Sequence, residues 1–375
     1  MRKIQMVDLT TQYKKIREEI DHSIADVIHS ASFINGPEVK KFSSNLAAYL
    51  GTAHVIPCGN GTDALQIALM ALGLKPGDEV ITSPFTFVAT AEVIALLGLK
   101  PVFVDIHPDT FNLDENKVEA AITNKTKCII PVHLFGQACE MKSIIGLAKQ
   151  HELFVVEDNA QATGAAFRAE GEWIKTGTMG DFGCTSFYPS KNLSTFGDGG
   201  ALFTNNDVFA EKASVICNHG SSKRYYYDEI GVNSRLDSMQ AAILNVKLKY
   251  LDKYNNARRL AADLYDQLLA GSGEVKTPFR ASYAKHVFHQ YTILVSRKRN
   301  ELQEFLARYE IPSMIYYPVP LHVSSAYGAF GYKQGDFPES ELVAKEVLSL
   351  PMHTELNHNQ QQFIAEKIQE FFTKN

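Results

Sequence analysis

The feature that most constrains this chain is a regular alternation of apolar strand-like and helix-like segments. Short apolar runs lie near residues 79–82, 101–104, 128–132 and 153–157, and helix-like stretches separate them. Strands roughly 25 residues apart, with helices between them, imply right-handed strand–helix–strand units and a largely parallel sheet. Because these strands are apolar along their length, we expect helices on both faces of the sheet. The predicted fold class is therefore α/β.

The segments on either side of this alternation have a different pattern. The first 50 residues and residues 237–269 carry apolar side chains at helical spacing, and strand-like residues 288–295 precede a closing amphipathic helix. We therefore predict a large domain over residues 1–250 and a smaller C-terminal α+β domain over residues 251–375. Because no repeat or low-complexity linker separates the two domains, we expect them to pack closely.

Composition narrows the class of protein further. The chain has 375 residues, 45% of them hydrophobic, and a net charge of −5, so neither a nucleic-acid partner nor a membrane partner is indicated. The amino terminus lacks a signal-like apolar stretch, and no run approaches the ~20 apolar residues of a membrane helix, so we expect a cytoplasmic protein. The five cysteines are scattered without CxxC spacing. They indicate buried thiols rather than disulfides or a metal site.

Two polar residues follow strand-like segments, where ligands bind in open α/β sheets. Asp158 ends the apolar run Val155-Val-Glu-Asp, and Lys191 lies between strand-like residues 182–187 and the Gly-rich turn 197–200. A lysine that forms a Schiff base with an aldehyde, and an acid for a pyridine nitrogen, are the pair that pyridoxal 5'-phosphate requires. The alternatives are a surface lysine and an aspartate that caps a helix. Because the lysine and the aspartate occur together, we favour the interpretation that they bind the cofactor.

A second pattern suits the phosphate of such a cofactor. Gly59-Asn-Gly-Thr-Asp-Ala-Leu-Gln opens a helix after a strand-like run, so backbone N–H groups and the helix dipole would meet an anion. Gly-rich turns before helices are common, and this one is neither a P-loop nor a dinucleotide fingerprint. Phe87 follows the next strand and can stack on a flat ring, although core packing explains an aromatic residue there almost as well.

Two later loops offer polar side chains for an anionic ligand. Asn233, Ser234 and Arg235 enter a helix and suit an anion, unless they only cap that helix. Arg224 belongs to the basic, aromatic loop over residues 219–227. This loop can hold a nucleotide diphosphate, or it can be an ordinary solvated loop.

A Pro-containing segment in the predicted small domain carries polar rings. Its residues Tyr316, Tyr317 and His322 can line a sugar pocket. Other histidines show no metal-ligand spacing, and we interpret them as core or surface residues: His286, His289 and His353.

Four motifs are highly specific in combination. They are Gly59-Asn-Gly-Thr-Asp-Ala-Leu, Glu157-Asp-Asn-Ala-Gln, Ser186-Phe-Tyr-Pro-Ser-Lys and Gly231-Val-Asn-Ser-Arg-Leu-Asp. Together they resemble the DegT/DnrJ-type nucleotide-sugar aminotransferases, a branch of the fold-type I enzymes that use pyridoxal phosphate. The resemblance runs from Ile34 to His353, nearly the whole chain.

This resemblance implies roles for individual residues. Lys191 would carry the cofactor and Asp158 would pair with its ring nitrogen, while Asn233 would reach the phosphate from the other subunit. The active unit would therefore be a homodimer with a shared active site. The remaining cofactor contacts would come from Gln161 and Phe87 at the ring and from Gly61, Thr62 and Ser186 at the phosphate.

Three segments are most similar to those of members that aminate C3 of a nucleotide-linked 3-ketosugar: Gly231-Val-Asn-Ser-Arg-Leu-Asp, Tyr317-Pro-Val-Pro-Leu and Leu350-Pro-Met-His. The resemblance implies transfer of an amino group from L-glutamate to a UDP- or dTDP-linked sugar for surface polysaccharide, such as the O-antigen of lipopolysaccharide. Amination at C4 and a non-catalytic regulatory protein of the same fold stay open as alternatives. Dehydratases of this fold replace the lysine with histidine, which Lys191 argues against.

Overall fold

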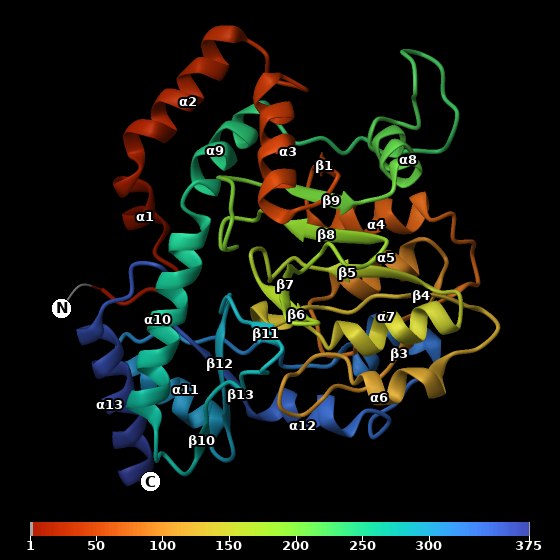
Figure 1. Ribbon diagram of the computed structural model, residues 1–375. Coiled ribbons are helices and arrows are strands. Elements are labelled where there is room, and N and C mark those ends of the chain that lie inside the picture. The colour runs from red at the N-terminus through yellow and green to blue at the C-terminus, as the bar shows by residue number, and fades with distance from the viewer. Residues whose placement is uncertain (1–2, 375) are drawn as a thin grey trace.

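A seven-stranded sheet forms the centre of the protein in the computed structural model, which describes residues 3–374 (Figure 1). The strands lie in the order β1 (His54–Cys58), β9 (Gly200–Thr204), β8 (Phe182–Ser186), β5 (Phe154–Asp158), β4 (Thr126–Ile129), β2 (Glu79–Thr82) and β3 (Lys100–Phe103). Neighbouring strands are parallel except at β9, which is antiparallel to both β1 and β8. The predicted α/β fold with a mostly parallel sheet is confirmed.

Helices cover both faces of this sheet, and the strands alternate between two hydrophobic clusters. On β4 and the residue after it, Cys128 and Ile130 pack into one cluster, whereas Ile129 between them packs into the other. The first cluster includes side chains of α4 (Gly61–Ala71), α5 (Ala89–Leu96) and α8 (Asp207–Cys217). The second includes side chains of α6 (Glu115–Val118) and α7 (Met141–Gln150). Burial on both faces explains why the strands read as continuous apolar runs.

The amino-terminal part of the chain consists of helices, of which the third packs against β1 at the edge of the large sheet. They are α1 (Leu9–Lys15), α2 (Arg17–Ser30) and α3 (Pro37–Leu50), and both α2 and α3 contact α9 (Ser238–Leu248). The helical stretch predicted over residues 237–269 is two helices, because α9 ends before α10 (Leu251–Leu269) begins. Hydrogen bonds from Lys249 N to Val246 O and from Tyr250 N to Lys247 O tighten the chain into a turn between them.

The carboxy-terminal part has its own sheet and core. Strands β10 (Val275–Lys276), β12 (Tyr291–Val295) and β13 (Val347–Leu350) form an antiparallel sheet. The helices there are α11 (Arg299–Arg308), α12 (Pro338–Glu346) and α13 (His358–Lys374). The short 3-10 turns Leu321–Val323 and Ser325–Phe330 lie between α11 and α12, whereas Glu119–Ala121 and Leu134–Gly136 belong to the part with the large sheet. Ile4 joins the core cluster of this part, so the chain's first segment packs against its last. The domain boundary at residue 250 stays a prediction.

A third, small sheet lies between the two parts. It consists of β11 (Ala284–Lys285), β6 (Ala166–Ala169) and β7 (Glu172–Lys175). Because β11 comes from the carboxy-terminal part and pairs with β6, this sheet ties the two parts together.

Two composition-based expectations can be compared with the fold. All five cysteines are buried and unpaired, as expected. Within residues 3–374, no helix is both long and apolar enough to cross a membrane.

Candidate active site

A cavity of about 710 Å³ opens at the carboxyl ends of β5 and β8. Parallel strands deliver their last residues to one edge of the sheet, where ligands bind in open α/β folds. The structure brings nine of the predicted site residues to this cavity: Gly61, Thr62, Phe87, Asp158, Gln161, Ser186, Lys191, Tyr316 and Tyr317. They come from segments far apart in the sequence, and the two tyrosines come from the carboxy-terminal part.

Asp158 is the last residue of β5 and is buried beneath the cavity. Its Oδ2 accepts a 2.8 Å hydrogen bond from Thr90 Oγ1, and its Oδ1 accepts a 3.1 Å bond from the backbone N of Ala160. Burial raises the pKa of this carboxyl, while the Thr90 hydroxyl and the nearby Lys191 oppose that shift. A cationic group beside Asp158 would therefore stabilise its charged form.

Lys191 lies in the connection between β8 and β9 and lines the same cavity. These two strands are adjacent and antiparallel, and the loop over residues 187–199 joins them without a crossover helix. Burial lowers the pKa of the Lys191 amine to about 8, although the Asp158 carboxylate opposes this effect. At pH 7 about a tenth of the amine is then uncharged, much more than for an ordinary lysine, and the uncharged form is the one that a nucleophile or base requires.

The first turn of α4 lies against the end of β8. A Cβ added to Gly61 would lie 2.7 Å from Ser186 Cβ, so this close approach requires glycine. Asn60 caps the helix by accepting a 2.8 Å hydrogen bond from Asp63 N. The first backbone N–H groups of a helix have no intrahelical acceptor, so Gly61 and Thr62 face the cavity with donors suited to a phosphate.

The aromatic side of the cavity is formed by Phe87 and Tyr317. Phe87 is 55% exposed, which decides against core packing, and its ring centroid lies 6.3 Å from that of Tyr317. Gln161 donates a 3.0 Å hydrogen bond from Nε2 to Tyr317 Oη and accepts a 2.7 Å bond at Oε1 from Phe135 N. The amide of Gln161 therefore positions the tyrosine and is itself fixed.

The loop before α9 is fastened to the α4 turn within the same protomer. Ser234 Oγ donates a 2.6 Å hydrogen bond to Asp63 Oδ2 and accepts a 2.9 Å bond from Gly59 N. The neighbouring Asn233 is exposed and does not line this protomer's cavity.

Two predicted substrate contacts lie elsewhere in the protomer. Arg224 is exposed on the loop after α8, which projects at the upper right of Figure 1, and its Nη2 donates to Tyr225 Oη. His322 is 1% exposed, contacts Phe337 edge to face and hydrogen-bonds through Nε2 to Glu341 Oε1 at 3.0 Å. The structure does not bring His322 to the cavity, because the chain turns at Pro320 into a 3-10 helix.

Sequence reasoning missed several polar residues here, among them Thr90, His289 and Gln290. Thr90 gave no signal beyond its place in the helix that follows Phe87. His289 and Gln290 line the cavity beside Lys191, whereas the sequence placed them in a strand beginning at residue 288. Because β12 begins only at Tyr291, both side chains are free to face the site.

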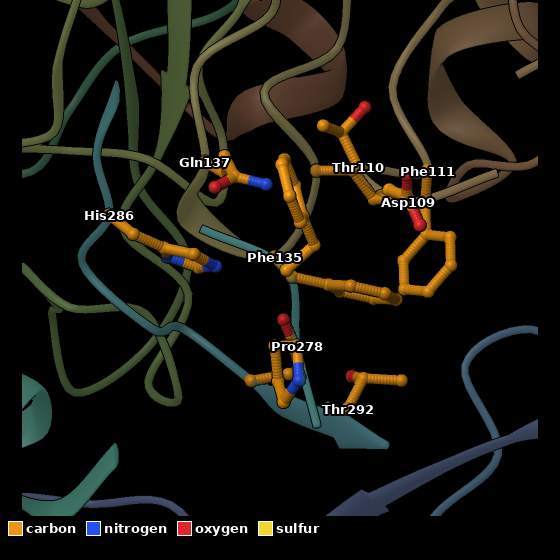
Figure 2. A pocket seen from close by; sticks show the side chains of 11 residues that line it. Asp109, Thr110, Phe111, Phe135, Gln137, Pro278, His286 and Thr292 are labelled. Atoms are coloured by element: carbon orange, nitrogen blue, oxygen red, sulfur yellow. The ribbon is translucent and has the colours of Figure 1, made fainter. Parts of the chain in front are cut away.

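Gln290 also lines a smaller cavity of about 10 Å³, whose lining residues are drawn in Figure 2. Such a volume suits about one water molecule. His286, read from sequence as a core or surface residue, borders this cavity and stacks on Phe288 with ring centroids 3.9 Å apart.

These residues fit pyridoxal phosphate. The buried Asp158 suits a protonated pyridine nitrogen, the uncharged amine of Lys191 suits the aldehyde, and the tight turn at Gly61 suits the phosphate. An α/β sheet covered on both faces, with this lysine and this aspartate at its carboxyl edge, defines the class of fold-type I pyridoxal phosphate enzymes.

The chain belongs to the DegT/DnrJ/EryC1/StrS aminotransferase family, whose model matches residues 14–369. The predicted family and enzyme class are thereby confirmed. Solved structures similar to this chain hold the cofactor in its pyridoxal or pyridoxamine form, in agreement with the predicted cofactor.

Three relatives show how close the similarity is. A "pleiotropic regulatory protein" of Geobacillus stearothermophilus is 51% identical, with 98% of each chain covered. The UDP-2-acetamido-2-deoxy-3-oxo-D-glucuronate aminotransferase of Pseudomonas aeruginosa is 43% identical, covering 94% of this chain and 96% of its own. The crystal structure of DesV from Streptomyces venezuelae, in complex with a ketimine intermediate, superposes with a TM-score of 0.95 at 38% identity and covers 99% of each chain.

Proposed function

We propose that this protein transfers an amino group from L-glutamate to the C3 keto group of a UDP- or dTDP-linked sugar. The observation that carries the proposal is the pair of Lys191 and Asp158 at one large cavity. Its support on the sugar side is the 43% identity to an aminotransferase named for a UDP-linked 3-oxo sugar. The product would be an amino sugar for surface polysaccharide, made in the cytoplasm.

Pyridoxal phosphate, when bound, supplies an electron sink and carries the amino group between the two substrates. The protein's residues would hold it at three points. Among the residues that line the cavity, Gly61, Thr62 and Ser186 would bind the phosphate, Asp158 would keep the ring nitrogen protonated, and Phe87 would stack on the ring. Gln161 orients Tyr317 beside the same ring.

Lys191 has two roles in this proposal. Its uncharged amine would bind the cofactor aldehyde, and once released it would carry a proton from the Cα of the amino donor to C4′ of the cofactor. The depressed pKa of Lys191, caused by burial, keeps enough amine uncharged for both tasks near pH 8. The same residue returns a proton to the sugar carbon that receives the amino group.

The active unit in this proposal is a homodimer. Asn233 is exposed next to Ser234, which is fastened to the α4 turn, so a short segment presents Asn233 outwards from the site's edge. The loop carrying Arg224 also exposes the rings of Tyr225, Tyr226 and Tyr227. Such a surface suits a second copy, whose phosphate and diphosphate subsites these residues would complete.

One observation favours a second function. A relative with 51% identity is named a pleiotropic regulatory protein, so the alternative of a non-catalytic regulatory role for this chain is kept. That function needs no buried amine with a lowered pKa near a buried carboxylate, and both groups are present here. It would predict a protein that does not react with an amino donor.

Assays with matched sugars test the assignment. The purified enzyme is supplied with glutamate and with UDP- and dTDP-linked 3-ketosugars or 4-ketosugars, and the aminated products are identified by mass spectrometry and NMR. The proposal predicts product from a 3-ketosugar. Product from 4-ketosugars alone would establish the C4 alternative, and no product from any of them would favour the regulatory one.

A further inference from the structure

The short segment that leads into α9 has one side inside the protomer and one side at its surface. Its side chains alternate, since Ser234, Leu236 and Ser238 are buried whereas Asn233 and Asp237 are exposed. Such an alternation is typical of extended backbone, in which successive side chains point to opposite sides. One side of the segment is therefore fixed by the fold, and the other side faces outwards.

The buried side of this segment is tied to the phosphate turn, which we define as residues 59–63 between β1 and the first turn of α4. Ser234 Oγ donates a 2.6 Å hydrogen bond to Asp63 Oδ2 and accepts a 2.9 Å bond from Gly59 N. A Cβ added to Gly59 would lie 3.0 Å from Asp63 Oδ2 and 3.3 Å from Ser234 Oγ, so the contact is closely packed. Ser234 thus fixes the distance between the phosphate turn and the segment that carries Asn233.

The backbone around Asn233 is also attached to the end of α8. The backbone N of Val232 donates a 2.8 Å hydrogen bond to Ile216 O, and the backbone N of Ser234 donates a 3.0 Å bond to Cys217 O. These bonds do not involve the Ser234 hydroxyl. Removal of that hydroxyl would therefore leave the segment attached to α8 but release it from the phosphate turn.

The place of the Asp63 carboxylate is unusual for a phosphate site. Asp63 lies in the first turn of α4 and lines the large cavity together with Gly61 and Thr62. A carboxylate is stabilised at a helix N-terminus, but it repels a bound phosphate nearby. The hydrogen bond to Ser234 gives this carboxylate a use that outweighs the repulsion, because it holds the segment before α9 in place.

We propose that Asp63 and Ser234 are positioning residues that align Asn233 with the cofactor phosphate of a second copy of this chain. The inference rests on the proposed function, since it takes the active unit to be a homodimer in which Asn233 completes the other copy's site. In this account the phosphate turn of one protomer supports the residue that reaches the phosphate in the other. The two cofactor sites of the dimer are thereby linked.

The test separates the effect of Ser234 on its own site from its effect on the opposite site. Mixed dimers are purified through two affinity tags, with Lys191→Ala in one protomer, so that only the other protomer links the cofactor to a lysine. Ser234→Ala is placed either in the protomer that keeps Lys191 or in the one that lacks it. The absorbance of the lysine-linked cofactor gives the Kd for pyridoxal phosphate and, separately, for pyridoxal, which lacks the phosphate. The thermal midpoint of each dimer is recorded.

We expect Ser234→Ala in the protomer without Lys191 to raise the Kd for pyridoxal phosphate at the opposite site about tenfold, because a hydrogen bond to a charged group is lost. The Kd for pyridoxal should stay unchanged, since Asn233 reaches only the phosphate. Asn233→Ala in the same protomer should have the same effect. The control is Ser214→Ala, which removes an exposed hydroxyl on α8 and should change neither Kd.

Two variants of Asp63 test the other partner of the contact. Asp63→Ala, placed in the protomer without Lys191, removes the acceptor of the Ser234 hydroxyl and should weaken binding of pyridoxal phosphate at the opposite site. Asp63→Asn keeps an oxygen that can accept this hydrogen bond, so it should restore most of the affinity.

The outcomes distinguish this inference from the proposed function. If Asn233→Ala raises the Kd at the opposite site but Ser234→Ala does not, the inference is overturned and the shared active site stands. If neither variant raises it, or the chain is a monomer in solution, the inference and the proposed role of Asn233 both fail. Equal weakening of pyridoxal and pyridoxal phosphate would show a general loss of structure and would also overturn the inference.

Discussion

Thr90 Oγ1 donates a 2.8 Å hydrogen bond to Asp158 Oδ2, and both side chains are buried. Thr90 is the second residue of α5 and Asp158 is the last residue of β5, so the contact joins a helix to the central strand beneath the cavity. The hydroxyl favours the ionised carboxylate, which burial disfavours. In the proposed function, Thr90, which lies outside the four motifs, would help to maintain the negative charge of Asp158 that the cofactor ring needs.

Removing that hydroxyl is expected to impair the cofactor site. Thr90→Val keeps the size of the side chain but leaves Asp158 without its side-chain donor, so the pKa of the carboxyl rises further. A hydrogen bond to a charged group contributes about 1.5–3 kcal/mol, so we expect kcat to fall by about tenfold or more. Thr90→Ser restores the hydroxyl and should recover most of the activity. Equal kcat in wild type and Thr90→Val would contradict the role of this contact.

Glu157 should be essential for stability rather than for chemistry. Its carboxylate is fully buried and accepts hydrogen bonds from the backbone N of Gly177, Met179 and Gly180 and from His133 Nε2. Removing one partner from a buried charged network typically costs about 3–5 kcal/mol. Glu157→Gln is therefore expected to lower the free energy of unfolding by several kcal/mol in urea titrations. Glu172→Gln, on exposed strand β7, is the control and should change it little.

The turn at Gly61 gives a prediction about cofactor affinity. In Gly61→Ala the new Cβ would lie 2.7 Å from Ser186 Cβ, so α4 and the end of β8 must move apart where the phosphate binds. We expect the Kd for pyridoxal phosphate, measured by fluorescence quenching, to rise at least tenfold. Gly146→Ala meets no atom within 4 Å in the middle of α7 and should leave the Kd unchanged. The idea fails if both variants bind the cofactor equally well.

The rate of cofactor capture should depend on pH. The unprotonated amine of Lys191 is the nucleophile, and burial lowers its pKa from 10.5 to about 8 in the cofactor-free protein. The reactive fraction therefore rises about tenfold per pH unit below pH 8 and levels off above it. Stopped-flow absorbance between pH 6 and 10 would show this profile. A rate that keeps rising to pH 10 would mean that the lysine has an unperturbed pKa.

Much of the large sheet was predictable, because each inner strand is buried on both faces and therefore reads as an apolar run. The position of Asp158 at the cavity was predictable for the same reason, since a carboxylate that ends such a run stands out. Lys191 lies in the loop after β8 and stood out only in combination with Asp158. The break between α9 and α10 was not, because Lys249 and Tyr250 are compatible with a continuous helix and only local hydrogen bonding ends it.

The position of His289 and Gln290 at the cavity depends on contacts between residues that are far apart in the sequence. A histidine in an apolar run is read as core or surface, and only the tertiary fold shows that the segment ahead of β12 reaches Lys191. The reverse holds for His322, whose Pro-flanked motif indicates a pocket but whose ring packs on Phe337. Neither placement has a local signal in the sequence.

The central claim is that Lys191 and Asp158 hold a cofactor that accepts an amino group from glutamate. The most direct test is the absorbance spectrum of the purified protein before and after glutamate is added. The account predicts a band near about 410–430 nm that moves to about 330 nm, as pyridoxal phosphate becomes its pyridoxamine form, and no such band shift in Lys191→Ala. A wild-type protein that stays colourless after pyridoxal phosphate is supplied would contradict the account.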